Sequence, residues 1–170
     1  MLKLLLLIPV LPRAPEFVRA SVAVAALVLS LYGTRALSHA FSECEAREYA
    51  GLSRLLERLP YGKRVAGLIY DPGSRYLRFS PYLHAVAWAQ VERGGAVMFS
   101  FADFPASPFR FREDNRPPRV PPRWEWLPAR VDSERELGFY DYVLTRSAPS
   151  RVHGFRRLAA DGAWALWSRP

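Results

Sequence analysis

Cysteine is nearly missing from this sequence, and its scarcity excludes two kinds of architecture. Cys44 is the single cysteine. One thiol cannot form an internal disulfide, and no cysteine-based zinc site can be assembled around it. Cys44 falls on the apolar face of a predicted helix, so we interpret it as a small buried hydrophobic residue.

Lysine is also scarce, although the chain is basic. All but Lys3 and Lys63 of the 24 basic residues are arginine, and with 16 acidic residues the net charge is +8. Arginine binds phosphate and carboxylate groups in a fork and stacks on rings, which favours an anionic partner such as lipid head groups. A coding bias toward arginine on solvated faces explains the composition equally well. No recognition motif accompanies the charge, so nucleic-acid binding is not expected.

The familiar motifs of cofactor and catalytic sites are absent too. The sequence has no G-x-x-x-x-G-K loop, no G-x-G-x-x-G after a strand, no nucleophile elbow and no H-E-x-x-H. Gly94-Gly95 follows a predicted helix and is interpreted as its cap, not as a phosphate cradle. We therefore expect no cofactor and no metal.

Charge is absent from Ala20 to Thr34, and Arg19 and Arg35 stand at the two ends of this stretch. Their long side chains can reach the interfaces of a bilayer while the apolar residues between them cross it. We therefore expect a transmembrane helix over residues 18–37. Basic residues cluster before this helix, so the positive-inside rule predicts that residues 38–170 are extracytoplasmic.

Two other interpretations of the N-terminal region stay open. The first is a cleaved signal peptide, with Val18-Arg19-Ala20 as the cleavage site. The second is the buried helix of a soluble protein. The apolar run that ends at Pro9 is too short to cross a membrane alone, so residues 1–17 are interpreted as a leader or as the end of a preceding membrane helix. In the latter case the chain is the C-terminal piece of a larger polytopic protein.

Beyond the membrane helix, the pattern alternates between helix and strand. Residues 38–59 carry apolar side chains at three- and four-residue steps, as in an amphipathic helix. Residues 65–70 and 96–101 are short apolar runs, and residues 82–93 between them have helical spacing. Two such strands joined by a helix predict parallel neighbours in a covered sheet.

The C-terminal residues predict a hairpin. Residues 139–145 form a strand-like run, and residues 155–160 and 163–168 follow as two strands joined at Asp161-Gly162. The order of elements predicts an α/β fold: a small Rossmann-like layered domain with a mainly parallel sheet and a C-terminal hairpin.

Periodicity disappears from residue 102 to residue 138, where prolines and arginines alternate with aromatic residues. A loop of this length is usually functional. Arginines held apart by prolines can reach phosphates, and tryptophans favour membrane interfaces or stack on sugars. The candidate ligand- or membrane-binding residues are Arg110, Arg112, Arg116, Arg119, Arg123, Trp124 and Trp126. Alternatively, the loop covers the sheet edge, with its arginines solvated or paired to Glu113, Asp114 and Glu125.

A second candidate site lies at the strand ends. Asp71 and Asp103 follow the carboxyl ends of the two predicted parallel strands, where open α/β sheets place their ligands. His84 lies one turn into the helix between them. Together the three side chains are the candidates for an alternative interpretation, an acid/base or metal site. The alternative is that Asp71-Pro72-Gly73 is ordinary turn chemistry and that His84 is simply packed or solvated.

Three short segments follow the predicted membrane helix in a recognisable order: Leu59–Val65 leading into a strand, the strand Asp141–Arg146, and the closing strand Gly162–Trp167. In these features the chain resembles the extramembrane C-terminal region of bacterial polytopic membrane glycosyltransferases that use a polyprenyl-phosphate-sugar donor. The resemblance covers most of residues 18–170. The catalytic acid of that family lies in an early extracytoplasmic loop of a many-helix domain, so the resemblance implies an accessory domain and no catalytic residue is carried over.

The expected function is therefore a membrane-anchored extracytoplasmic accessory domain that is not an enzyme as an isolated chain. Its expected partners are membrane lipids or polyprenyl-phosphate head groups and a polytopic membrane protein. Two alternatives are a small enzyme acting on a phosphorylated or glycosylated substrate through Asp71, Asp103 and His84, and an interaction domain that docks a membrane partner through residues 102–138.

Overall fold

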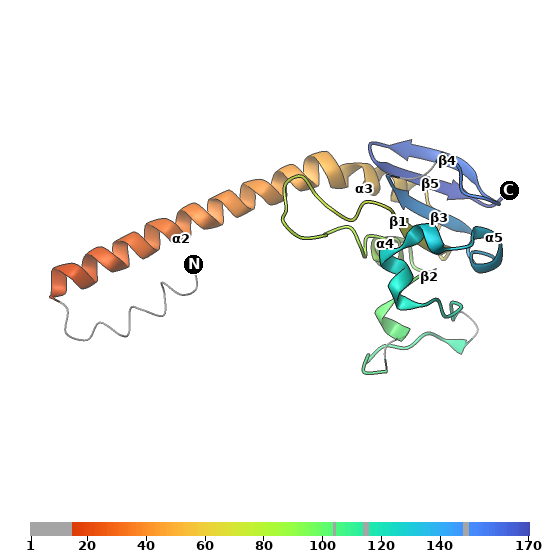
Figure 1. The fold of residues 1–170 in the computed structure, drawn as a ribbon, viewed down its shortest axis with the longest axis horizontal. Coiled ribbons are helices and arrows are strands. Elements are labelled where there is room, and N and C mark those ends of the chain that lie inside the picture. The colour runs from red at the N-terminus through yellow and green to blue at the C-terminus, as the bar shows by residue number, and fades with distance from the viewer. Residues whose placement is uncertain (1–14, 104, 114–115, 148–149) are drawn as a thin grey trace. The chain divides into compact units, whose positions relative to one another are not determined.

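The computed structural model describes residues 15–103, 105–113, 116–147 and 150–170 (Figure 1). Only the backbone is described for Asp103, Pro122 and Arg123. The chain divides into two compact units, Met1–Ser42 and Glu43–Pro170. Most of the N-terminal segment 1–17, interpreted above as a leader or a helix end, lies outside the described residues.

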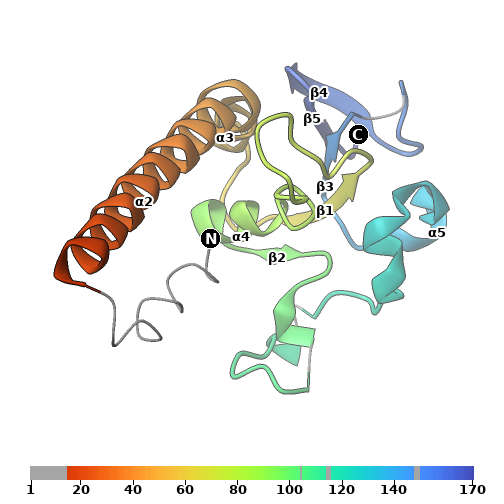
Figure 2. The ribbon, with the colours of Figure 1, turned by 60° about the vertical axis from the view of Figure 1, so that its left-hand side comes forward.

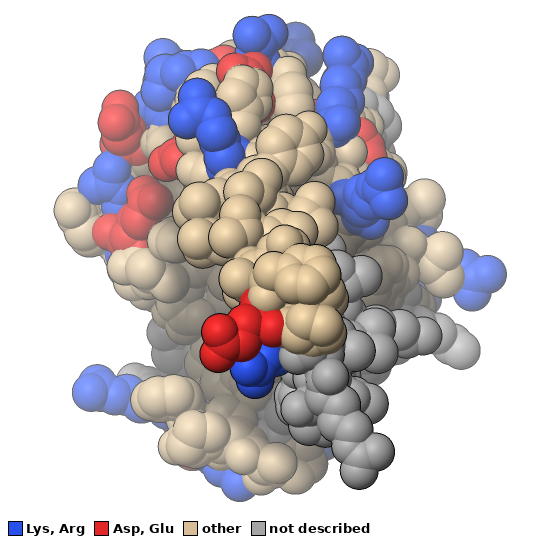
Figure 3. All heavy atoms as spheres, turned by 90° about the vertical axis from the view of Figure 1, so that its left-hand side faces the viewer, with Lys and Arg blue, Asp and Glu red and all other residues tan. Residues whose placement is uncertain are grey.

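The first described element is the long helix α2 (Glu16–Cys44), with 29 residues. At 1.5 Å per residue it is about 43 Å long, more than the hydrocarbon core of a bilayer. Apolar side chains such as Val24, Leu31 and Tyr32 are exposed on it, and uncharged residues dominate this surface in Figure 3. The predicted apolar helix over residues 18–37 is thus confirmed, and α2 is long and apolar enough to cross a membrane.

The helical path continues as a π-helix, η2 (Glu45–Tyr49), and then as α3 (Ala50–Glu57). Leu52, Leu55, Leu56 and Leu59 are fully buried, which confirms the amphipathic face predicted for this region. Cys44 is buried as well, as expected. The π-helix was not predicted, because nothing in the apolar spacing distinguishes it from an α-helical turn.

Five strands form one mixed sheet: β1 (Arg64–Ile69), β2 (Ala96–Val97), β3 (Tyr142–Arg146), β4 (Arg156–Asp161) and β5 (Trp164–Ser168). Their order in the sheet is β2-β1-β3-β5-β4. β1 is parallel to both β2 and β3, whereas β5 is antiparallel to both β3 and β4. The α/β class, the parallel β1–β2 pair and the hairpin at Asp161-Gly162 are confirmed. The sheet is mixed, so the expectation of a mainly parallel sheet is not confirmed.

The crossover helix α4 (Ala87–Arg93) is shorter than the predicted helix over residues 82–93. Tyr82 and His84 accept hydrogen bonds from amides three residues later, so residues 82–86 form turns before the α-helix begins. Gly94 ends the helix with a positive φ of 69°, and its amide donates to Gln90 O. The predicted glycine cap is therefore confirmed.

The sheet separates two layers (Figure 1, Figure 2). On one side α3 packs against β4, β5 and α4. The long loop supplies the other cover, in which the short helices η5 (Pro122–Trp126) and η6 (Pro128–Arg130) contact β1, and α5 (Ser133–Glu136) follows. The core under this loop joins Val143 and Trp167 of the sheet to Leu137. Because side chains alternate along a strand, Leu144 and Arg146 point to the helical side.

Candidate functional site

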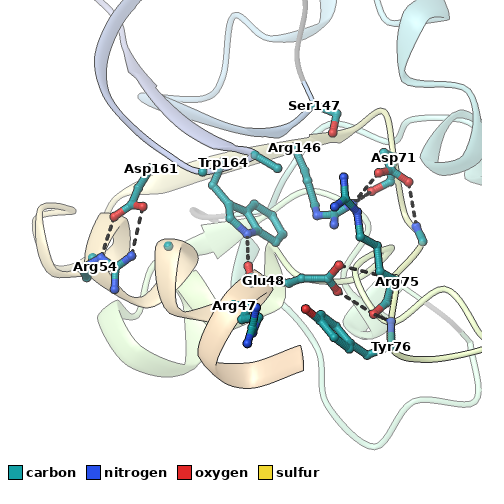
Figure 4. Close-up of a pocket in the computed structure, with 15 residues that line it drawn as sticks. Arg47, Glu48, Arg54, Asp71, Arg75, Tyr76, Arg146, Ser147, Asp161 and Trp164 are labelled. Atoms are coloured by element: carbon teal, nitrogen blue, oxygen red, sulfur yellow. Dashed lines mark hydrogen bonds and ion pairs between the residues drawn. The ribbon is translucent and has the colours of Figure 1, made fainter. Parts of the chain in front are cut away.

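A polar pocket of about 550 Å³ lies at the carboxyl ends of the parallel strands β1 and β3 (Figure 4). Its wall combines the segment after β1, the end of β3, the β4–β5 turn and the first residues of the η2–α3 helix. This edge is where α/β sheets place their ligands, because the loops that follow parallel strands converge there.

Arg146 is the buried charge of this pocket. Its side chain is only 5% exposed, and its Nη1 donates a hydrogen bond to Asp71 O and forms an ion pair with Asp71 Oδ2 at 2.9 Å. The guanidinium carbon lies 4.1 Å from the centre of the Tyr82 ring and 5.6 Å from that of Trp164. These aromatic faces stabilise the buried cation. Arg146 Nε is buried and has no hydrogen-bond partner among the described residues.

The local sequence places Arg146 at this position for a simple reason. β3 enters the sheet between β1 and β5, and its residues Val143, Leu144 and Thr145 are fully buried. Arg146 is the last residue of the strand and pairs with Trp164 of β5. The sequence signal that could have marked Arg146 as a site residue is its charge, which directly follows the apolar residues of a strand.

Glu48 closes the opposite wall from the π-helix η2. Its carboxylate accepts hydrogen bonds from Ser74 Oγ at 2.5 Å, from the amide of Arg75 at 3.1 Å and from Tyr82 Oη at 2.8 Å. Its backbone oxygen accepts the indole N–H of Trp164 at 2.7 Å. Glu48 thus ties the helix both to the segment after β1 and to the hairpin, and π-turns of this kind are often found at functional sites.

The hydrogen bonds also set the protonation of Glu48. Partial burial by itself would raise the pKa of this carboxyl group, but the bonds from Ser74, Arg75 and Tyr82 outweigh it and hold the pKa below the usual glutamate value. The same network, together with burial, raises the pKa of Tyr82. Glu48 is therefore a carboxylate at neutral pH, and Tyr82 is a neutral donor.

The rim of the pocket carries three further arginines. Arg54 makes a bidentate pair with Asp161 at 2.6 and 3.0 Å, and Arg47 pairs with Glu43 at 2.6 Å. Arg75 is exposed, and its guanidinium has no ion-pair partner in the described part of the chain. Figure 4 shows the Arg54 pair at one end of the pocket and Arg146 at the other, with Trp164 between them. Cationic donors without a full set of carboxylate partners suit an anionic ligand.

The three residues predicted for an acid/base site do not all meet. Asp71 lines the strand-end pocket, and its Oδ1 accepts the amide of Gly73 at 3.1 Å, as expected of turn chemistry. His84 lines a second pocket with Glu125. The side chain of Asp103 lies outside the described residues. Within the described ranges, no group of three or more His, Cys, Asp and Glu side chains could hold a metal ion.

The second pocket is an apolar hollow of about 640 Å³ under the long loop, lined in part by Phe99, Phe101 and Val120. His84 Nδ1 lies 2.6 Å from Glu125 Oε1, and the Glu125 side chain is 15% exposed. Burial raises the pKa of Glu125, and His84 offsets only part of that rise. The pair connects the turn before α4 to the long loop.

The arginines and tryptophans predicted as binding residues lie away from the strand-end pocket. Arg110, Arg112, Arg116 and Arg119 are exposed, and Arg119 lines the apolar hollow. The side chain of Arg123 lies outside the described residues. Trp126 is exposed, whereas Trp124 is half-buried. Comparisons with protein-family models, with curated proteins and with solved structures found no match to this chain.

We expect Glu48 to stabilise the fold in a pH-dependent way. Its folded-state pKa lies below the usual value of 4.5, so its stabilisation is present above pH 4.5 and is lost as the pH falls through the folded-state pKa. Glu48→Gln should lower the free energy of unfolding at pH 7 by about 1 kcal/mol. It should also make the free energy of unfolding decline less steeply as the pH falls below 4.5. Chemical denaturation from pH 3 to 7 measures both. The exposed Glu45 of the same π-helix provides the control Glu45→Gln, and identical pH profiles for the two variants would contradict the assignment.

Proposed function

We propose that this chain is a membrane-anchored accessory domain whose Glu43–Pro170 unit binds a phosphate-bearing ligand at the strand-end pocket. In this proposal α2 spans the membrane and the unit lies on the extracytoplasmic side, as the distribution of arginines about α2 favours. The resemblance to the C-terminal region of lipid-linked sugar transferases supports the same role. The observation that carries the proposal is the buried Arg146 guanidinium, whose Nε has no hydrogen-bond partner among the described residues.

The donor geometry of Arg146 favours phosphate. Asp71 contacts only Nη1, and Nε is buried without a hydrogen-bond partner among the described residues. Nε and Nη2 form the edge of a guanidinium that binds two oxygens of one phosphate or carboxylate side by side. An enclosed, uncompensated donor of this kind is uncommon in native proteins and calls for an explanation. A ligand that supplies two oxygen acceptors would provide it.

Asp71 acts in this proposal as a competitor for the ligand. Its carboxylate is 55% exposed and occupies the guanidinium that a phosphate would bind. Arg75, exposed on the same wall, adds a positive charge that the ligand can recruit. The hydroxyl group of Ser147, directly after β3, lies in the wall as well and can hydrogen-bond a phosphate or sugar oxygen.

The proposal predicts opposite effects for two neighbouring substitutions. Arg75→Gln should weaken phosphate binding about fivefold because one charge-assisted contact is lost. Asp71→Asn should tighten it about threefold, since asparagine keeps the acceptor for Gly73 but removes the competing charge. Isothermal titration of the detergent-solubilised full chain with inorganic phosphate, glucose 1-phosphate and short-chain phosphatidic acid measures the affinities and separates a sugar phosphate from a lipid head group.

The control for this experiment is Arg78→Gln. Arg78 is exposed on the same connecting segment as Arg75, and it does not line the pocket. It carries the same charge, so a purely non-specific electrostatic effect would weaken binding equally in both variants. Equal affinities for all variants, or no binding of any of the three probes, would overturn the proposal.

A further inference from the structure

The segment of residues 99–127, which we call the aromatic loop, exposes three large aromatic side chains. Phe101, Phe109 and Trp126 are 64%, 76% and 60% exposed. Single exposed apolar residues are common, but three large aromatic side chains in one segment mark an interaction surface. The loop extends beyond the β2 edge of the sheet in both ribbon views (Figure 1, Figure 2).

This exposure is selective. Phe99 and Val120, in the same loop, pack against the core cluster of the sheet, and Pro117 is buried. The loop therefore has a packed side and an outward side, and the outward side carries the aromatic rings. The apolar hollow of about 640 Å³ described above is lined largely by phenylalanine, valine and proline. The loop therefore carries apolar side chains both inside this hollow and on its outward side.

Arginines stand beside the exposed rings. Arg110 and Arg112 alternate with Phe109 and Phe111, and both arginines are exposed. Arg110 Nη2 donates to Pro105 O at 3.2 Å, which leaves the rest of its guanidinium for other acceptors. Aromatic rings next to arginines are the composition found where proteins meet the head-group region of a bilayer, since the rings favour the interface and guanidinium groups bind lipid phosphates.

The chain itself indicates which surface the loop meets. α2 is long and apolar enough to cross a membrane, and Glu43 follows the first unit directly, without a linker. If α2 spans, as in the proposed function on which this inference rests, the Glu43–Pro170 unit is held within reach of the bilayer. Tethering of this kind raises the effective concentration of lipid at the loop, so even weak interfacial contacts are populated.

We propose that the aromatic loop docks on the membrane surface, with Phe101, Phe109 and Trp126 in the head-group region and Arg110 and Arg112 on lipid phosphates. This contact is separate from the strand-end pocket, because none of these five residues lines that pocket. It would give the unit a fixed face toward the bilayer.

The experiment uses the full chain in nanodiscs made with lipids brominated near the head group, which quench tryptophan emission at short range. Trp126→Phe should remove at least half of the quenchable emission. Trp88→Phe is the matched control, because Trp88 is also exposed but lies on α4 outside the loop. If Trp126→Phe removes no more quenchable emission than Trp88→Phe, the loop does not reach the bilayer and the inference is overturned.

A charge reversal tests the arginines. Arg110→Glu with Arg112→Glu should reduce quenching at least twofold in discs containing anionic lipid, because two attractive contacts become repulsive. Arg151→Glu with Arg156→Glu makes the same charge change at two exposed positions outside the loop and should leave quenching unchanged. Equal losses in the two double variants would count against specific docking by the loop. The same disc scaffold surrounds both double variants, so a difference in quenching between them reflects the loop.

The same preparation separates this inference from the proposed function. Co-purification of the chain with nanodiscs of unbrominated lipid reports on membrane insertion of α2. Phosphate titration reports on the strand-end pocket. A chain that enters discs and binds phosphate but shows no quenching at Trp126 would refute loop docking and leave the proposed function standing. A chain that does not enter discs would refute both.

Discussion

Arg146→Met should reduce phosphate binding at the strand-end pocket at least about 25-fold. Among the described residues, the substitution removes the one buried cation that lines the pocket, and it keeps an unbranched apolar side chain against Tyr82 and Trp164. Truncating one partner of a desolvated, hydrogen-bonded charge pair costs about 2–5 kcal/mol of binding free energy, and each 1.4 kcal/mol is about tenfold in affinity. Titration of the full chain with the phosphate probes measures the loss.

Stability and binding must be separated for this variant. Arg146 also donates a hydrogen bond to Asp71 O and pairs with its carboxylate, so Arg146→Met should lower the free energy of unfolding by about 2 kcal/mol, the usual size for a hydrogen bond to a charged group. Arg146→Lys keeps the charge but loses the planar fork, and we expect it to recover only part of the affinity. A methionine variant that folds and binds phosphate within threefold of the natural chain would exclude Arg146 as the ligand-binding residue.

Gly95→Ala, at the residue directly before β2, should be the most destabilising glycine-to-alanine substitution among the described glycines, at about 4 kcal/mol or more. A Cβ at this position would lie 2.0 Å from Lys63 O, and the residue has a φ of +84°. The obstructing atom is a backbone carbonyl next to Arg64, whose register partner in β2 is Ala96. Relief of the clash would therefore separate the β1–β2 pair rather than rotate a side chain.

The control for this prediction is Gly62→Ala. Gly62 has a φ of +72°, and a Cβ there meets nothing within 4 Å. Gly62→Ala should lower the free energy of unfolding by only about 1–2 kcal/mol, the cost of the left-handed backbone conformation for a residue with a Cβ. Urea unfolding of the detergent-solubilised chain, followed by near-ultraviolet circular dichroism, measures both variants. Similar losses in the free energy of unfolding for the two variants would contradict the prediction, because they would show that the backbone at Lys63 can move away from the added Cβ at little cost.

The local elements of this protein follow from its sequence. An uninterrupted apolar run predicts α2, and the spacing of Leu52, Leu55 and Leu56 predicts the face that α3 buries. The glycine after Arg93 predicts the end of α4, and Asp161-Gly162 predicts the hairpin turn. Each of these features depends on residues that are close in the chain, and their conformational preferences can therefore be read from neighbouring positions.

The strand-end pocket follows from contacts that no local pattern contains. Arg146 meets the oxygens of Asp71 across 75 positions, and Arg54 meets Asp161 across 107. These pairs exist because β3 lies between β1 and β5, an order that the run of apolar residues in each strand does not encode. The sequence marked Asp71 as a strand-end residue but grouped it with His84, whose carboxylate neighbour in the fold is Glu125.

The sequence by itself therefore determined the membrane-length helix, the α/β class, the amphipathic helical face and the turns, because neighbouring side chains and glycines set these. Only the tertiary structure decided the mixed strand order, the π-turn that places Glu48 against Trp164, and the burial of Arg146 with Nε lacking a partner among the described residues. These three features have the same physical cause. Desolvation and hydrogen bonding between distant segments depend on which surfaces meet, and that is settled only when the whole sheet closes against its helices.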